Sequence, residues 1–205
     1  MFVCGVPRNS AEFQCYLNLE HSLFGRLSVP TETAQTFFRL RPEIYQVVIA
    51  PGDVVAAYSS AYPLQPKWAQ ALIAGEIAEP DLTPSMLLRR DESLEGSTFY
   101  IGSVVVANGY DRLTKLKLLA SLISWRARQF EAACINRLRV ILTPVTEEGE
   151  RMARQGGARL LNDGTGRKDG YPVCGRDITR GFLTGVATAL ERCLDSSIVE
   201  MNYNF

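Results

Sequence analysis

A strand followed by a long amphipathic helix constrains the fold of this chain more than any other feature. Residues 98–107, TFYIGSVVVA, are apolar enough to predict a strand buried on both faces. Residues 113–131 repeat apolar side chains at helical spacing, which predicts a helix with these residues facing inward. That predicted face consists of Leu116, Leu119, Ile123, Ala127 and Phe130. A strand at 137–143 and a helix after Thr146 repeat the unit, and this alternation predicts a right-handed parallel crossover.

The flanking segments extend this unit into a mixed α/β sheet with helices on both faces. Further helices are predicted at 10–29, between Pro30 and Pro42, at 66–77 and at 179–195. Further strands are predicted at 44–50, 54–62, 158–161, 173–178 and 197–205. The first two of these strands flank a Pro-Gly-Asp turn and predict a β-hairpin. Residues 78–96 are predicted to be mostly loop, and residues 162–172 a flexible loop.

Composition excludes several classes of function. The 205 residues carry equal numbers of basic and acidic side chains, which argues against a general nucleic-acid binder. Five widely spaced cysteines with no CxxC pair predict reduced thiols and a cytoplasmic protein. The single histidine, His21, rules out a two-histidine metal site within one chain, and no metal is expected. No apolar run approaches the roughly 18 residues of a membrane span, and no secretory signal is expected.

The order of elements and several local phrases resemble the GNAT superfamily of acyl-CoA-dependent N-acyltransferases. The phrases that carry the resemblance are VVAAYSSAYPL, FYIGSVVVANGYDRLTKLKLLASLI and VILTPVTEEGERMARQGGARLL. The resemblance covers about residues 10–178, which implies a GNAT-like domain at 1–178. Residues 179–205 are then a C-terminal extension that packs on this domain or on a partner subunit, where it would seal a homodimer.

The resemblance implies acetyl-CoA or another acyl-CoA as cosubstrate. In the family, a turn with Arg or Gln, two residues, Gly, one residue and Gly or Ala holds the pyrophosphate on backbone N–H groups. Arg112 matches the first place, whereas Lys115 and Lys117 stand where the small residues belong. The lysines are either mobile charges for an anion or solvent-facing side chains. The expected cofactor-binding residues are Val104, Val105, Val106, Arg112, Leu113, Thr114, Lys115, Leu116 and Lys117.

Catalytic residues are harder to assign because the family's usual pair is missing. Many members place a Glu on the fourth strand and a Tyr in the fourth helix. Here residues 98–107 contain no acid, and Ala153 stands at the Tyr position. The candidate substitutes are Glu20, His21, Ser103, Tyr171 and Tyr58. Each also has a purely structural interpretation, as a surface pair, a buried strand residue or a packed aromatic. Gly102 and Ser103 are further predicted to form a bulge or to allow a close approach.

Two functions follow from the sequence. In the first, the chain transfers an acyl group from acyl-CoA to a small-molecule or peptide amine by direct attack on the thioester. In the second, it is a catalytically inactive GNAT-like binding or regulatory module, because the turn glycines, the Glu and the Tyr are all missing. Neither interpretation expects a nucleic acid or a membrane as partner.

Overall fold

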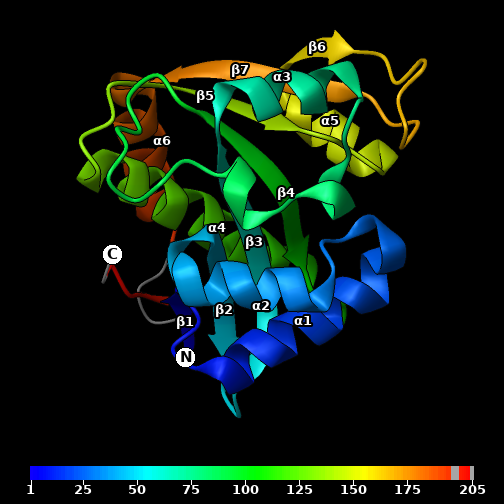
Figure 1. The fold of residues 1–205 in the computed structure, drawn as a ribbon. Coiled ribbons are helices and arrows are strands. Elements are labelled where there is room, and N and C mark those ends of the chain that lie inside the picture. Colours follow the sequence, from blue (N-terminus) through cyan, green and yellow to red (C-terminus); the bar gives the residue numbers. More distant parts are fainter. Residues whose placement is uncertain (195–198, 204–205) are drawn as a thin grey trace.

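The computed structural model describes residues 1–194 and 199–203, and these form an eight-stranded mixed sheet with helices on both faces (Figure 1). The strand order is β6-β7-β5-β4-β3-β2-β1-β8. The strands are β1 Phe2–Gly5, β2 Tyr45–Ala50, β3 Val54–Leu64, β4 Thr98–Val106, β5 Arg137–Leu142, β6 Arg159–Asn162, β7 Val173–Thr179 and β8 Val199–Met201. The helices are α1 Ser10–Phe24, α2 Thr31–Leu40, α3 Pro66–Ala74, α4 Arg112–Ala132, α5 Glu147–Gln155 and α6 Arg180–Cys193. The predicted α/β class is confirmed.

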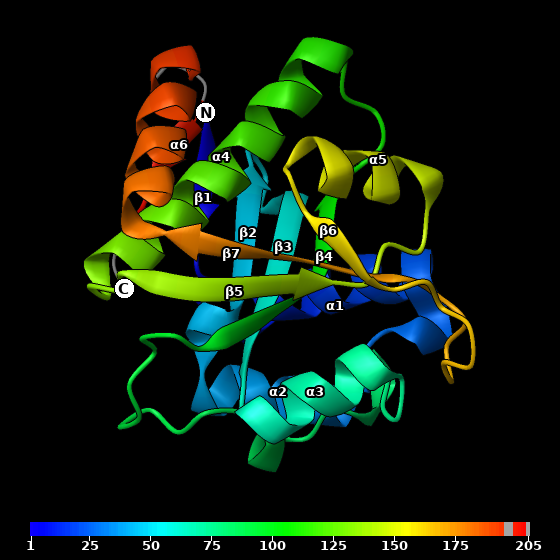
Figure 2. The ribbon, with the colours of Figure 1, turned by 90° about the horizontal axis from the view of Figure 1, so that it is seen from above.

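The helices divide between the two faces of the sheet. Helices α4 and α6 lie together on one face, and α1, α2 and α3 lie on the other (Figure 2). The core under α1 and α2 is rich in aromatic rings in contact with one another, such as Phe13, Tyr16 and Tyr45. The opposite core is centred on Leu118, Leu122 and Trp125 of α4, which are at most 2% exposed. Burial of these two apolar layers holds the sheet between them.

Strand β4 is the point at which the sheet opens. It pairs antiparallel with β3 over its whole length, with an irregularity at Gly102 where Ser60 faces Ser103 and Ala61 faces Ile101. This confirms the predicted bulge. On its other edge β4 pairs in parallel with β5 only from Thr98 to Ile101. From Gly102 to Val106 the strand continues without a partner in β5, so the two strands separate.

The C-terminal segment is part of the same body. Helix α6 packs along α4, and β8 pairs in parallel with β1. Residues 195–198 and 204–205 of the predicted helix and final strand lie outside the described residues. Strand β1 was not predicted from the sequence, because its four residues are too few for a visible alternation.

Two predictions about helices are wrong in detail. Helix α1 ends at Phe24 rather than at residue 29, because Gly25 has a φ of 54° and its N–H bonds to the carbonyl of His21. The predicted inner face of α4 is wrong in part: Leu116 is 54% and Ile123 39% exposed, whereas Ala127 and Phe130 are each 4% exposed. Helix α4 carries two apolar stripes, and the sheet covers the one with Leu118, Leu122 and Trp125. Ile123, Ala127 and Phe130 of the second stripe line a cavity described below.

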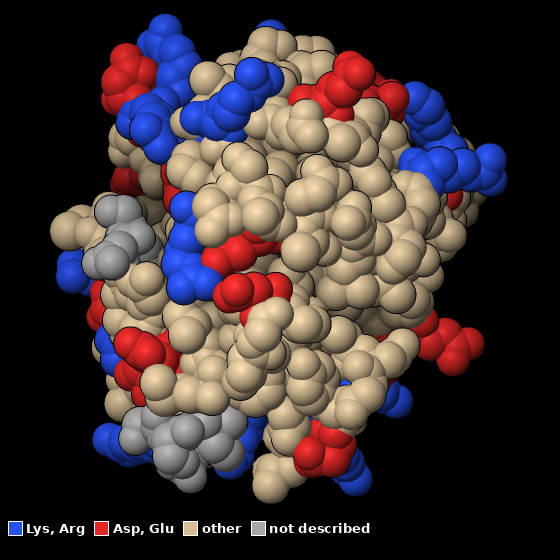
Figure 3. All heavy atoms as spheres, turned by 90° about the horizontal axis from the view of Figure 1, so that it is seen from below, with Lys and Arg blue, Asp and Glu red and all other residues tan. Residues whose placement is uncertain are grey.

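The surface carries charges of both signs. The face seen from below is largely uncharged, and its basic and acidic side chains lie near each other without forming a broad patch of one sign (Figure 3). This agrees with the formal net charge of zero. In the part of the chain that the structure describes, no helix is long and apolar enough to cross a bilayer.

Candidate functional site

Two cavities meet where β4 and β5 separate. One has a volume of about 390 Å³ and the other about 400 Å³. Phe24, Gly102, Thr143 and Val145 line both of them. Gly102 belongs to β4 just beyond its last pair with β5, and Thr143 follows the end of β5. The two cavities therefore share their walls at the opening in the sheet.

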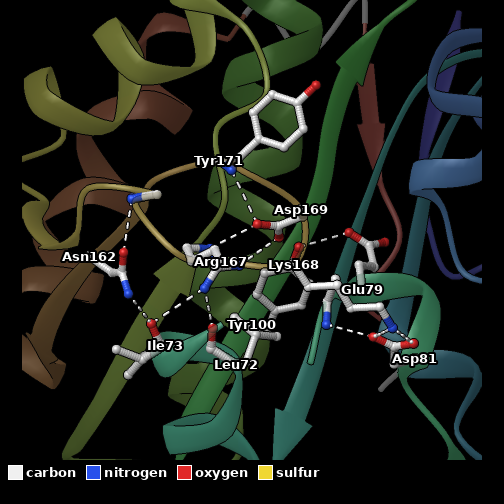
Figure 4. Close-up of polar contacts among 12 residues, drawn as sticks. Leu72, Ile73, Glu79, Asp81, Tyr100, Asn162, Arg167, Lys168, Asp169 and Tyr171 are labelled. Carbon is white, nitrogen blue, oxygen red and sulfur yellow. Dashed lines mark hydrogen bonds and ion pairs between the residues drawn. The ribbon is translucent and has the colours of Figure 1, made fainter. Parts of the chain in front are cut away.

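The first cavity is lined by acidic side chains. They come from three parts of the chain: Glu20 from α1, Glu79 and Asp81 from the loop after α3, and Asp169 from the loop before β7. We call this space the acidic cavity. Lys168 bonds to Asp81 at 2.7 Å, and Arg167 bonds to Asp169 at 2.6 Å (Figure 4). No such ion pair is found for Glu20 or Glu79 among the described residues.

Glu79 reaches the opening between the strands. One carboxylate oxygen, Oε2, accepts a hydrogen bond from the Tyr100 hydroxyl at 2.9 Å (Figure 4). The other, Oε1, lies only 2.7 Å from the place that a Cβ on residue 102 would occupy. Glycine at this position therefore lets the carboxylate lie against the backbone of β4.

The pKa of Glu79 is raised to about 8. Burial of the carboxyl is the largest cause, the negative charge of Glu20 raises it further, and the hydrogen bond from Tyr100 lowers it. A carboxyl that titrates close to neutral pH can both accept and return a proton, which ordinary surface carboxyls do poorly. Perturbed groups of this kind concentrate at functional sites.

Glu20 is the second buried acid of this cavity. Glu20 is 4% exposed, and the Oε2 atom of its carboxyl has no hydrogen-bond partner among the described residues. Burial raises the pKa of the Glu20 carboxyl, while the nearby hydroxyls of Tyr58, Ser28 and Ser103 favour its charged form. Arg26 and Lys168 also line this cavity, and Lys168 is bonded to Asp81. Since neither Glu20 nor Glu79 forms an ion pair among the described residues, the two carboxyls suit a positively charged ligand.

The loop before β7 is fixed in place through a buried arginine. The Arg167 side chain has no exposed surface and donates to the carbonyl of Leu72 and, at 3.4 Å, to that of Ile73, at the C-terminus of α3. A guanidinium also complements the negative end of the helix dipole. Gly75, which has a φ of 83°, lies directly against the Arg167 side chain. A Cβ at residue 75 would lie only 2.5 Å from the Arg167 Cγ, so only glycine leaves space for this arginine. The predicted flexible loop thus has an anchored centre, which sets Asp169 and Tyr171 on the acidic cavity.

The second cavity is mostly apolar, and we call it the apolar cavity. The one charged side chain in its described lining, Arg126, donates to the carbonyls of Glu43 and Ile44. Its walls come from β4, β5, β7, α4, α5 and α6. Four of the large hydrophobic side chains that are more than a third exposed line it: Val104, Ile123, Met152 and Phe182. Exposed apolar surface gathered around one hollow is typical of a ligand site. This cavity also explains why Ile123 of α4 is exposed although it is apolar.

The N-terminus of α4 is capped by its own side chain. The Asp111 carboxylate accepts from the N–H groups of Leu113 at 2.9 Å and Thr114 at 3.0 Å, and from the Thr114 hydroxyl. These bonds lower the pKa of Asp111, the hydroxyl of Thr114 contributing most. Within the described chain, Arg112, Lys115 and Lys117 form no ion pair with an acidic side chain. The turn therefore offers cationic side chains, while two of its backbone donors are already bonded.

The candidate site residues predicted from the sequence lie in different parts of the structure. Glu20 and Tyr171 line the acidic cavity, whereas Ser103 and Val104 line the apolar one. Ser103 also hydrogen-bonds Ser60 at 3.1 Å. His21 lies in neither cavity, and its ring faces the Val29 carbonyl at 3.4 Å and the Thr31 hydroxyl at 3.5 Å.

The remaining expected cofactor residues lie on β4 and at the start of α4. Val105 and Val106 pack against the two cores. The roles of Leu113, Thr114, Leu116 and the three cations of the turn stay predictions. Glu79 was missed by the sequence analysis because it stands in a segment with no periodic signal. In the described part of the chain, no group of three or more His, Cys, Asp or Glu side chains could hold a metal ion.

Comparisons with known proteins identify the type of fold. No family model and no curated protein matches this sequence. Among solved structures, FeeM, an N-acyl amino acid synthase from uncultured soil microbes, superposes with a TM-score of 0.58 at 12% identity, covering 94% of this chain and 97% of FeeM. NAA60 of Arabidopsis thaliana in complex with acetyl-CoA gives 0.57 at 11% identity, covering 87% and 99%. The CoA-dependent acyl-homoserine lactone synthase BjaI gives 0.51 at 14% identity, covering 98% and 93%. The chain therefore has a GNAT-like fold, that of the acyl-CoA N-acyltransferases.

Proposed function

We propose that the protein is an N-acyltransferase that moves an acyl group from acyl-CoA to an amine. The donor lies in the apolar cavity and the amine in the acidic cavity. The observation that carries this proposal is the carboxylate of Glu79 at the opening between β4 and β5, where the two cavities share their walls. The thioester carbonyl would sit at this opening, within reach of both sides.

The donor side is supported by the free edge of β4. Residues after Ile101 have no partner in β5, so backbone N–H and C=O groups there are open to the polar groups of a pantetheine arm. The solved structures that share the fold include one with acetyl-CoA bound and one that is a CoA-dependent synthase. The proposed cofactor residues remain the strand segment Val104–Val106 and the turn from Arg112 to Lys117.

The acceptor side is supported by the charges of the acidic cavity. An amine arrives as a cation and is attracted by Glu20 and by the ionised fraction of Glu79. Glu79 takes one proton from it, because its pKa of about 8 lies nearer to that of an amine than an ordinary carboxyl does. Tyr100 holds the carboxylate in place through its hydroxyl. The acceptor class stays a small-molecule or peptide amine.

The transfer itself needs no covalent enzyme intermediate. The lone pair of the neutral amine attacks the thioester carbonyl carbon, the carbon–sulfur bond breaks, and an amide and a thiolate form. The thiolate takes a proton from Tyr171, which lines the acidic cavity. The attacking nitrogen then gives up one of its two protons to the Tyr171 oxygen and keeps the other as the amide hydrogen. Positioning of the two substrates supplies much of the rate.

A GNAT-like module without transferase activity is the second candidate. The observation that favours it is the Asp111 cap, which occupies the N–H groups of Leu113 and Thr114 and places a negative charge where a pyrophosphate would bind. Under this alternative the cavities bind ligands without turnover. A cytoplasmic location and a homodimer through residues 179–205 are proposed for either candidate.

One pair of measurements separates the two candidates. CoA and acyl-CoA are titrated into the protein by calorimetry, and release of the CoA thiol is then followed with a panel of primary amines. Binding with thiol release that depends on the amine supports the transferase. Binding without release for every amine supports the module. No binding at millimolar CoA contradicts the proposed function.

A further inference from the structure

The apolar cavity extends past the opening between the strands. Val140 of β5 lines it, and Val140 pairs with Phe99 in the region where β4 and β5 are still joined. Ile178 of β7 and Phe182, Leu183 and Val186 of α6 line the same end. This end therefore lies behind the opening, on the side away from the unpaired residues Gly102–Val106. We call it the distal end.

The distal end is lined by apolar side chains. Ala127 and Phe130 of α4 and Leu183 of α6 are at most 5% exposed and belong to one hydrophobic cluster with Phe99 and Leu138. Acidic groups that could bind an amine are absent from the described lining of this cavity and occur in the other one. A polar acceptor would lose its hydration here without gaining partners, so the distal end suits a hydrocarbon.

A pantetheine arm along Gly102–Val106 would deliver its thioester at the opening. The acyl chain then has two directions, into the acidic cavity or into the distal end. Only the distal end is apolar, and an acetyl group would leave most of it unfilled. An unfilled apolar hollow costs the protein packing contacts.

We infer that the acyl group carried by the donor is a medium or long hydrocarbon chain, which lies in the distal end between α4, α6 and β7. This inference rests on the proposed function, because the thioester must first sit at the opening. Helix α6 thereby belongs to the donor site and sets the length of chain that fits. Each methylene moved from water into such a site strengthens binding roughly fourfold until the space is full.

The test is a chain-length series. The Kd values of acetyl-, butyryl-, hexanoyl-, octanoyl- and dodecanoyl-CoA are measured by calorimetry without an acceptor. Affinity should rise roughly fourfold per methylene from acetyl-CoA and level off where the cavity is filled. Equal affinity for all lengths overturns the inference while leaving acyl-CoA binding intact. Failure of every CoA thioester to bind overturns the proposed function as well.

A substitution at the distal end sharpens the test. Val186→Phe places an aromatic ring in the distal end. It should lower the affinity for octanoyl-CoA about tenfold more than the affinity for acetyl-CoA. Ala189→Phe adds the same ring to the exposed face of α6, outside the cavity, and should leave the length preference unchanged. If Val186→Phe lowers the affinity for octanoyl-CoA and for acetyl-CoA by the same factor, the inference is overturned. If that variant does not fold, the Kd values of the wild-type protein for the chain-length series test the inference by themselves.

Discussion

The carboxylate of Glu79 and the backbone of Gly102 fit together only because residue 102 lacks a side chain. A Cβ there would lie 2.7 Å from Glu79 Oε1, 2.8 Å from Ser60 Oγ and 2.9 Å from Tyr62 Cε2. Ser60 and Tyr62 are at most 1% exposed and cannot move aside easily. The catalytic proposal therefore depends on two residues that lie 23 positions apart in the sequence, and this contact has no local signature.

Gly102→Ala should destabilise the protein by roughly 1–3 kcal/mol, since the added methyl overpacks a buried site. Urea unfolding measures this loss. Gly181→Ala is the matched control, because nothing lies within 4 Å of a Cβ there and alanine favours the helix. Equal stability of the two variants would show that the contact at Gly102 is looser than described.

Replacing Glu79 tests its raised pKa through stability. A carboxyl whose pKa rises on folding stabilises the folded state at low pH, and this contribution is lost as the pH rises through about 8. The free energy of unfolding of the wild type should therefore fall relative to Glu79→Gln between pH 5 and pH 9. Glu76→Gln, at an exposed glutamate in the same loop, is the control. A difference that does not change with pH would contradict the burial of Glu79.

Among the helices and strands, the first turn of α4 combines an acidic N-cap with three basic side chains. Asp111 stabilises the helix by accepting from two N–H groups, while Arg112, Lys115 and Lys117 bring positive charge to the same turn. Cations at a helix N-terminus oppose the dipole. The side chains rather than the backbone donors are then the groups available to the phosphates of a donor.

Asp111→Ala should separate stability from binding. Loss of the N-cap should lower the free energy of unfolding by about 1 kcal/mol. The affinity for CoA should increase, because two N–H groups become free and a negative charge is removed. Calorimetry and thermal unfolding measure both effects, with Asp91→Ala, at an exposed loop residue, as control. Weaker CoA binding in Asp111→Ala would mean that the cap itself shapes the phosphate site.

The loop before β7 makes a second prediction at this scale. Arg167→Met removes the partner of half-buried Asp169 and the guanidinium donors to the Leu72 and Ile73 carbonyls, so it should cost roughly 3 kcal/mol of stability. Arg159→Met, at an exposed position on β6, should cost little. Chemical denaturation distinguishes them. Equal effects would show that Arg167 does not anchor the loop.

At the scale of the whole molecule, local periodicity predicted the elements and tertiary contacts decided the site. The β4–α4 and β5–α5 units were visible because each repeats one pattern over many residues. Strand β1 was not, since four residues gain strand structure only by pairing with β2 and β8. The inner face of α4 was misjudged in part, because the sheet covers Leu118, Leu122 and Trp125 while Ile123 borders the apolar cavity. Glu79 and Arg167 act through tertiary contacts, with Tyr100 21 positions from Glu79 and with Leu72 95 positions from Arg167.

The opening between β4 and β5 is the centre of this account, and a structure with CoA bound tests it most directly. The protein would be crystallised with millimolar CoA, and the position of the pantetheine arm determined. We predict that it lies along Gly102–Val106, with its sulfur at the opening near Gly102 and Thr143. A pantetheine arm bound elsewhere, or no bound CoA at that concentration, would contradict the account.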